Sequence, residues 1–206
     1  MIALGLAHLA FAWALFVLLA PLTSSLWWRC GLLTATSVLS VVSIDGLSMA
    51  AYARSLTDDL AISGLLLLGW LTLQRLGVVQ PVAASSRLIV LLVFAALALA
   101  LYPATLGLTY FDPYRWGYNP RPMIIIVAVI ALGLICLRSA LGVAMLTTAT
   151  LAFTLRLKPS ENYWDYLIDP LLALYCCGAL LSLAVRFVYH RTTGQRRSAA
   201  LSAGNV

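Results

Sequence analysis

The sequence contains very little charge. Only 10% of its 206 residues are charged, whereas 63% are hydrophobic, and a soluble domain usually carries about 25% charged residues. So few polar groups cannot cover the surface of a soluble protein of this size. The composition therefore excludes an ordinary soluble domain and predicts an integral membrane protein. In a membrane protein, the location of the charges that make up the net charge of +6 indicates which loops face the cytoplasm. We therefore expect no nucleic-acid partner.

Residues that carry metal, redox or catalytic chemistry are also scarce. The two histidines are His8 and His190, and the four cysteines have neither zinc-ligand nor CxxC spacing. The chain has no Walker A loop, G-x-S-x-G elbow, H-E-x-x-H motif or dinucleotide fingerprint. Haem needs histidines within membrane spans, and only His8 lies in one. We therefore expect no cofactor and no metal site, and the sequence argues against an enzyme.

Apolar segments occupy most of the chain. A helix needs about 20 apolar residues to cross the hydrocarbon core, with a range of about 17–25. As one helix, the run 123–157 would be about 52 Å long and would bury Arg138 near its centre, at a cost of several kcal/mol. A hairpin that turns at Arg138 and Ser139 avoids both problems. The spans we expect are thus two helices within 123–157 and the segments 2–22, 31–53, 60–73, 88–108 and 171–189.

The basic residues predict an orientation for these seven spans. With the C-terminus in the cytoplasm, the N-terminus lies outside, and eight arginines face inward against five basic residues outside. No lysine or arginine precedes the first apolar run, so no cleaved signal peptide is expected. The fold class we expect is an all-α polytopic membrane bundle over residues 1–191, followed by a disordered basic cytoplasmic tail over 192–206. Alanine- and arginine-rich usage indicates a bacterial inner membrane.

Two outward segments, 109–122 and 158–170, concentrate aromatic and charged side chains. Flat rings beside both charge signs suit a partner protein or a sugar ring, and paired arginines suit a lipid-linked phosphate. The alternative is an aromatic belt with helix caps, in which Asp169 caps a last helix that begins at Pro170. The binding residues we expect are Tyr114, Arg115, Trp116, Arg121, Trp164, Asp165 and Asp169.

Asp45 falls within the expected span 31–53, and an ionisable residue inside a membrane indicates function. His8 lies at a similar depth in the first span, so the two residues would relay protons or hold a metal ion if their helices are neighbours. The alternative is that Asp45 is protonated or is bonded to nearby serines or backbone. The catalytic assignment stays open, with Asp45, His8 and Asp112 as candidates.

These features favour a non-catalytic membrane subunit or scaffold of a cell-envelope complex. Its partners would be membrane lipid and either another membrane or periplasmic protein or a lipid-linked glycan, docked on the two outward segments. The alternative is a small membrane enzyme or transporter that acts at the outer face on a lipid-linked or small polar substrate. The working residues of that alternative would be Asp45, Asp112, Arg115 and Asp165, assisted by His8.

Overall fold

A computed structural model describes the backbone of residues 2–203 and the side chains of residues 3–190. The described chain is helical apart from one short β-hairpin. The α-helices are α1 (Ile2–Leu19), α2 (Leu26–Val41), α3 (Met49–Thr57), α4 (Ile62–Arg75), α5 (Ala84–Thr105), α6 (Pro120–Cys136), α7 (Ala140–Thr154), α8 (Trp164–Leu167) and α9 (Pro170–Ala203). Two 3₁₀ helices, η1 (Ala20–Leu22) and η2 (Tyr114–Tyr118), and two strands, β1 (Ser43–Ile44) and β2 (Leu47–Ser48), complete the described part.

Three of the described helices are long and apolar enough to cross a membrane, over Ala3–Leu22, Ala84–Thr105 and Pro170–His190. The helices α6 and α7 are apolar but shorter. This helical architecture is the one expected from the composition, and it is compatible with insertion into a lipid bilayer.

The apolar run 123–157 folds as the predicted hairpin of two helices. The turn between α6 and α7 contains Arg138 at a φ of 54°, and the Ser139 N–H donates to the Leu134 carbonyl at 2.9 Å. A residue in the left-handed conformation, followed by an N–H that bonds to a carbonyl five residues earlier, is a usual C-terminal cap of a helix. The Ser139 hydroxyl also pairs with that of Ser86 at 2.9 Å, which ties the turn to the start of α5.

The expected continuous span over 31–53 is wrong. The helix α2 ends at Val41, and the antiparallel strands β1 and β2 follow before α3 begins. Asp45 and Gly46 form the two-residue turn, with φ values of 49° and 83°. An Asp-Gly pair favours this hairpin turn because both of its residues need positive φ. Asp45 is therefore an exposed turn residue and not a residue buried inside a span.

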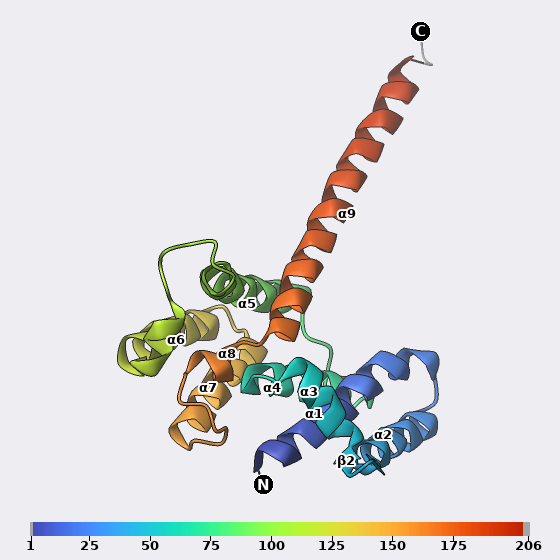
Figure 1. Ribbon diagram of the computed structural model, residues 1–206. Helices are drawn as coiled ribbons and strands as arrows, with labels where there is room; N and C mark the ends of the chain where they lie inside the picture. Colours follow the sequence, from blue (N-terminus) through green and yellow to red (C-terminus); the bar gives the residue numbers. More distant parts are fainter. Residues whose placement is uncertain (1, 204–206) are drawn as a thin grey trace.

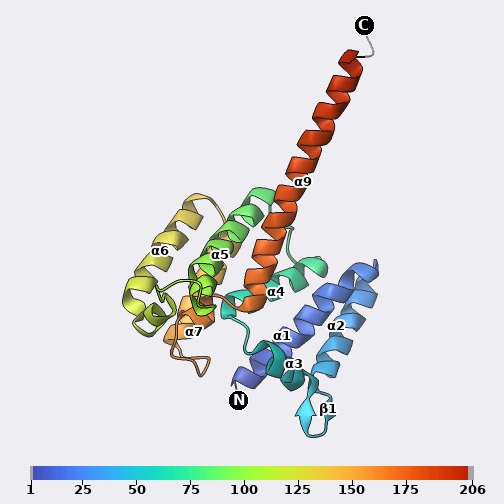
Figure 2. The ribbon, with the colours of Figure 1, turned by 45° about the horizontal axis from the view of Figure 1, so that its top comes forward.

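The helices form two groups that α4 connects. Figure 1 shows α5, α6 and α7 on one side and α1, α2 and α3 on the other, and α4 contacts both α1 and α7. The first half of α9 packs against α5, whereas its C-terminal half extends well beyond the other helices (Figures 1 and 2). The helix continues through Ala203, across most of the segment expected to be a disordered tail, and residues 204–206 lie outside the described residues.

Candidate functional site

The two segments that were predicted to face outward, 109–122 and 158–170, lie side by side and bind each other. The Trp164 indole N–H donates to the Pro113 carbonyl at 2.9 Å, and the Asn162 amide donates to the Tyr114 carbonyl at 3.0 Å. The Tyr163 N–H donates to the Gly117 carbonyl at 3.1 Å. We call this contact between η2 and residues 162–164 the loop junction. It places segments 109–122 and 158–170 on the same face of the protein.

Gly117 makes the loop junction possible. A Cβ atom at this position would overlap the Asn162 side chain and come within 3.0 Å of the Trp164 ring. Asn162 is itself fully buried, and its side-chain oxygen accepts the Trp164 N–H at 3.0 Å. The close approach therefore needs a residue without a side chain at position 117.

Some of the expected binding residues pack inside the protein at or beside the loop junction. Trp164 and Asp169 are each only 5% exposed. The Asp165 carboxylate accepts hydrogen bonds from the hydroxyls of Tyr114 and Ser160. Burial and the neighbouring Asp165 carboxylate raise the pKa of the Tyr114 hydroxyl, so it remains a proton donor.

Other expected residues remain on the surface. Arg115, Trp116 and Arg121 are exposed, and Trp116 packs edge-on against Phe111 with ring centroids 5.2 Å apart. Asp112 accepts a hydrogen bond from the Tyr114 N–H at 3.0 Å, which is the bond of a local turn. The exposed aromatic side chains of this face are Tyr110, Phe111, Trp116 and Tyr118.

The only lysine of the sequence, Lys158, is 6% exposed and connects the loop junction to the α3–α4 connection. Its ammonium donates to the carbonyls of Asp165, Asp59 and Leu60 at 2.7, 3.0 and 3.1 Å. Burial lowers the pKa of this lysine, while the nearby Asp59 carboxylate opposes that shift. Three acceptors match the three N–H donors of the charged ammonium. Sequence reasoning did not single out Lys158, because its partners lie up to 99 residues away.

Asp169 is the predicted N-cap of α9, and the structure confirms it. One carboxylate oxygen accepts the Leu172 N–H at 2.8 Å, and the other accepts the Ala61 N–H at 3.0 Å. Burial raises the pKa of this carboxyl, and the two N–H donors oppose the shift. Gly64 of α4 lies against the same carboxylate, where a Cβ atom would collide with it. Asp169 therefore holds the start of α9 to the start of α4.

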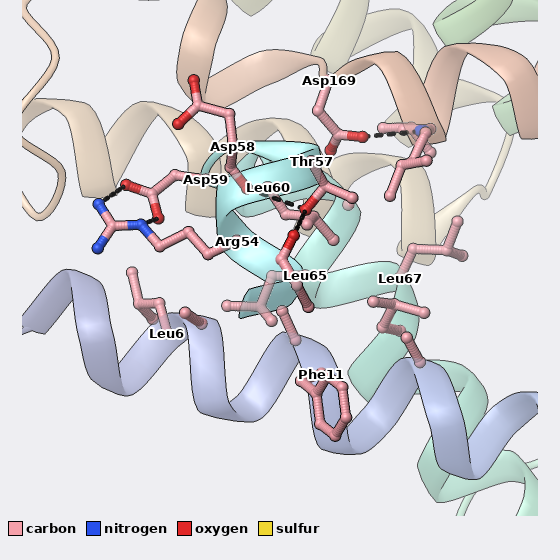
Figure 3. Close-up of a pocket in the computed structure, with 18 of the residues that line it drawn as sticks. Leu6, Phe11, Arg54, Thr57, Asp58, Asp59, Leu60, Leu65, Leu67 and Asp169 are labelled. Atoms are coloured by element: carbon pink, nitrogen blue, oxygen red, sulfur yellow. Dashed lines mark hydrogen bonds and ion pairs between the residues drawn. The ribbon is translucent and has the colours of Figure 1, made fainter. Parts of the chain in front are cut away.

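A cavity of about 510 Å³ begins beside these two buried charges. Its walls are mainly apolar side chains of α1, α3, α4 and α9, and its charged lining residues are Arg54, Asp58, Asp59, Lys158 and Asp169. Figure 3 shows Arg54, Asp58 and Asp59 together near Leu6, with Phe11 and Leu67 farther along the cavity. The site thus has a long apolar part and a charged end at Arg54, Asp58 and Asp59, while Asp169 lies closer to Leu67 (Figure 3).

The residues at the charged end differ in how they are paired. Arg54 forms a two-pronged ion pair with Asp59, at 2.7 and 2.8 Å. Asp58 is exposed, and its carboxylate accepts no hydrogen bond from the described residues. Its backbone has a φ of 60° and a ψ of −171°, a region that only glycine adopts readily and that costs about 1–3 kcal/mol for other residues.

The expected pairing of His8 with Asp45 does not occur among the described residues. His8 shares a hydrogen bond with the Ser40 carbonyl at 2.9 Å, while Asp45 occupies the exposed hairpin turn. Within residues 2–203, no three His, Cys, Asp or Glu side chains gather where a metal ion would bind.

Comparison with family models, curated proteins and solved structures finds no match to this chain. The fold and the site define an all-helical protein with membrane-compatible helices, a cavity that is apolar along its length, and a charged end beside the loop junction.

Proposed function

We propose that this protein is a non-catalytic integral membrane subunit or scaffold of a cell-envelope complex that holds a lipid or lipid-linked glycan. The ligand's hydrocarbon chain lies in the cavity, and its headgroup lies at the charged end and on the exposed rings of the loop junction. One observation carries the proposal: the cavity lining is mostly apolar and carries charged side chains at Arg54, Asp58, Asp59, Lys158 and Asp169. This distribution matches an amphiphile.

The dimensions of the cavity support a lipid chain as the occupant. Its lining on α1 runs from Leu6 to Leu18, which is about 18 Å at 1.5 Å per residue. One leaflet of a bilayer contributes about 15 Å, half of a hydrocarbon core about 30 Å thick. A groove of this length therefore accommodates most of one acyl or prenyl chain.

The bonding of the candidate reactive residues supports a role without catalysis. Asp112 closes a local turn, Asp165 accepts bonds from Tyr114 and Ser160, and His8 bonds to the backbone. Lys158 uses all three of its donors internally. A general acid or base must lie within hydrogen-bond reach of the proton it transfers, and each of these groups already has a structural partner.

Hydrogen bonds between distant segments support a seven-span topology with the N-terminus outside. In this topology α1, α2, α4, α5, α6, α7 and α9 are the spans, and α3 lies at the outer face. Arg29 bonds to the Thr23 and Arg75 carbonyls, which both lie inside. Lys158 bonds to the Asp59 carbonyl, and both residues lie outside. Such bonds join segments only where they emerge on the same side.

Cysteine labelling tests this topology. In a cysteine-free background and intact spheroplasts, we expect a membrane-impermeant maleimide to label Asp45→Cys and Glu161→Cys, which are exposed and on the proposed outer side. Gln80→Cys, also exposed, should be labelled only after the membrane is permeabilised. Labelling of positions 45 and 161 from opposite compartments would contradict the proposed outer face.

Blocking the cavity tests ligand binding. Ala14 lines the cavity on α1, so Ala14→Trp should fill the space and exclude a hydrocarbon chain. The matched control is Ala96→Trp on the exposed face of α5. We expect protein purified in mild detergent to retain about one tightly bound lipid per chain in the wild type and the control. The Ala14→Trp variant should lose roughly nine-tenths of it, which corresponds to binding weakened about 100-fold.

Quantitative lipid extraction and mass spectrometry of every copurified component provide the measurement. Equal lipid content in the blocked variant and its control would contradict the proposal. A stoichiometric protein partner without bound lipid would favour protein docking by the exposed rings of Phe111, Trp116 and Tyr118 instead. Loss of a measured transport or transfer activity on Asp112→Asn, with assembly intact, would favour the enzyme or transporter alternative.

A further inference from the structure

We infer that the charged end of the cavity recognises a phosphoethanolamine headgroup: the Asp58 carboxylate binds the primary ammonium, and Arg54 binds the phosphate. This inference rests on the proposed function, because it assumes that a lipid chain occupies the cavity. It adds the chemical class of the lipid, a zwitterionic phospholipid with N–H donors.

The balance of charge at this end favours a ligand that brings a cation. Three acidic and two basic residues line the cavity, namely Asp58, Asp59, Asp169, Arg54 and Lys158. Lys158 and Asp169 are buried and directed to backbone partners. Neither is available to a headgroup, so the exposed Asp58 and the partly buried Arg54 and Asp59 decide what binds.

Within the described side chains, these three residues leave one positive and one negative group without a hydrogen-bond partner. Asp59 is taken by its two-pronged pair with Arg54, which uses the Nε and Nη2 atoms of the guanidinium. In the described part of the chain, Nη1 of Arg54 and the carboxylate of Asp58 have no hydrogen-bond partner. A guanidinium with a free N–H binds phosphate well, and a carboxylate binds an ammonium well. The two open groups lie at the same end of the cavity (Figure 3).

The backbone of Asp58 supports a role beyond packing. Its φ of 60° and ψ of −171° are costly for a residue with a side chain, and such conformations concentrate at ligand sites. The Lys158 ammonium holds the next two carbonyls, those of Asp59 and Leu60. These two bonds hold the connection from α3 to α4, which keeps Asp58 at the lining of the cavity.

The hydrogen-bonding capacity of the headgroup separates ethanolamine from other lipids. A primary ammonium offers three N–H donors to Asp58, whereas the trimethylammonium of choline has the same charge and no donor. A glycerol headgroup brings no cation to balance its phosphate charge beside the carboxylates of Asp58 and Asp59. With identical chains, we therefore expect a phosphatidylethanolamine to bind about tenfold more tightly than the matching phosphatidylcholine or phosphatidylglycerol, which corresponds to one charge-assisted hydrogen bond.

Native mass spectrometry in detergent, titrating each of these three lipids with matched dioleoyl chains, tests the inference. Asp58→Asn should still bind lipid but reduce the preference to within about twofold. Asp58→Gly, which removes the carboxylate and relieves the backbone, should do the same. Asp45→Asn is the matched control, because Asp45 is also an exposed aspartate at positive φ and lies in the hairpin turn away from the cavity lining.

The outcomes separate this inference from the proposed function. Saturable binding of all three lipids with equal affinity, lost in Ala14→Trp, would overturn the headgroup assignment and leave the cavity as a lipid site. A preference that persists in both Asp58 variants would also overturn the assignment. Failure of the wild type to bind any of the three lipids, with Ala14→Trp unchanged, would overturn both proposals.

Discussion

Lys158→Met should lose about 3 kcal/mol of unfolding free energy or more. The substitution keeps most of the side-chain volume but leaves the carbonyls of Asp59, Leu60 and Asp165 without their donor. Each buried acceptor left unpaired costs about 1–3 kcal/mol, and breaking a buried charged interaction typically costs about 3–5 kcal/mol in total. Chemical denaturation of the purified protein in a fixed detergent measures the difference.

The matched control for this substitution is Arg156→Met. Arg156 is exposed, lies two residues from Lys158 and carries the same charge. Its replacement should change the free energy by no more than about 0.5 kcal/mol, as is usual for exposed sites. If both variants lose the same amount, net charge and not the three carbonyl bonds would explain the loss.

Gly117→Ala should open the loop junction. The added Cβ atom would overlap the Asn162 side chain and crowd Trp164, so η2 must move away from residues 162–164. That movement breaks the bonds from Asn162 to Tyr114 and from Trp164 to Pro113. We expect a loss of about 2–4 kcal/mol, the range of overpacking combined with lost buried hydrogen bonds.

Two measurements check the effect of Gly117→Ala. Denaturation gives the free energy, and limited proteolysis should cut within 106–119 in the variant and not in the wild type. Gly133→Ala in α6 and Gly178→Ala in α9 are matched controls, because a Cβ atom at either position meets nothing within 4 Å. Both should be neutral or stabilising, since alanine favours a helix over glycine by about 1 kcal/mol. Equal destabilisation by a control would refute the steric explanation.

Local sequence signals predicted much of the helical structure. The apolar runs marked the long helices, and the cost of burying Arg138 predicted the turn between α6 and α7. Asp169 before Pro170 predicted the start of α9. Each of these features depends on residues that are near one another in the chain, so pattern and propensity were sufficient.

Hydropathy failed at residues 43–48 because the residues around the turn are themselves apolar. Ile44 and Leu47 hide the hairpin in a hydropathy window, while the Asp45–Gly46 pair marks it as a turn. The Asp-Gly signal favours two positive φ angles in succession, which an α-helix cannot contain. Giving that local signal more weight than the apolar run would have removed Asp45 from the membrane.

The candidate site was only partly visible in the sequence. The two outward segments were expected on one face, and they do lie together, but much of their aromatic surface faces inward as the loop junction. The ring faces and carboxylates that suit a foreign partner also suit each other. The roles of Lys158, Asn162 and Gly117 depend on contacts between distant segments, and no local pattern encodes these.

The hydrogen bonds of Lys158 to residues far away in the sequence affect the order in which the protein folds during synthesis. Its ammonium holds two carbonyls that precede it by 99 and 98 residues. The connection between α3 and α4 therefore lacks these hydrogen bonds until the segment that follows α7 has left the ribosome. Because chains fold from the N-terminus as they emerge, the cavity is one of the last parts of the protein to form. A nascent chain that stops before residue 158 would contain most of the cavity lining but not the lysine that binds the α3–α4 connection.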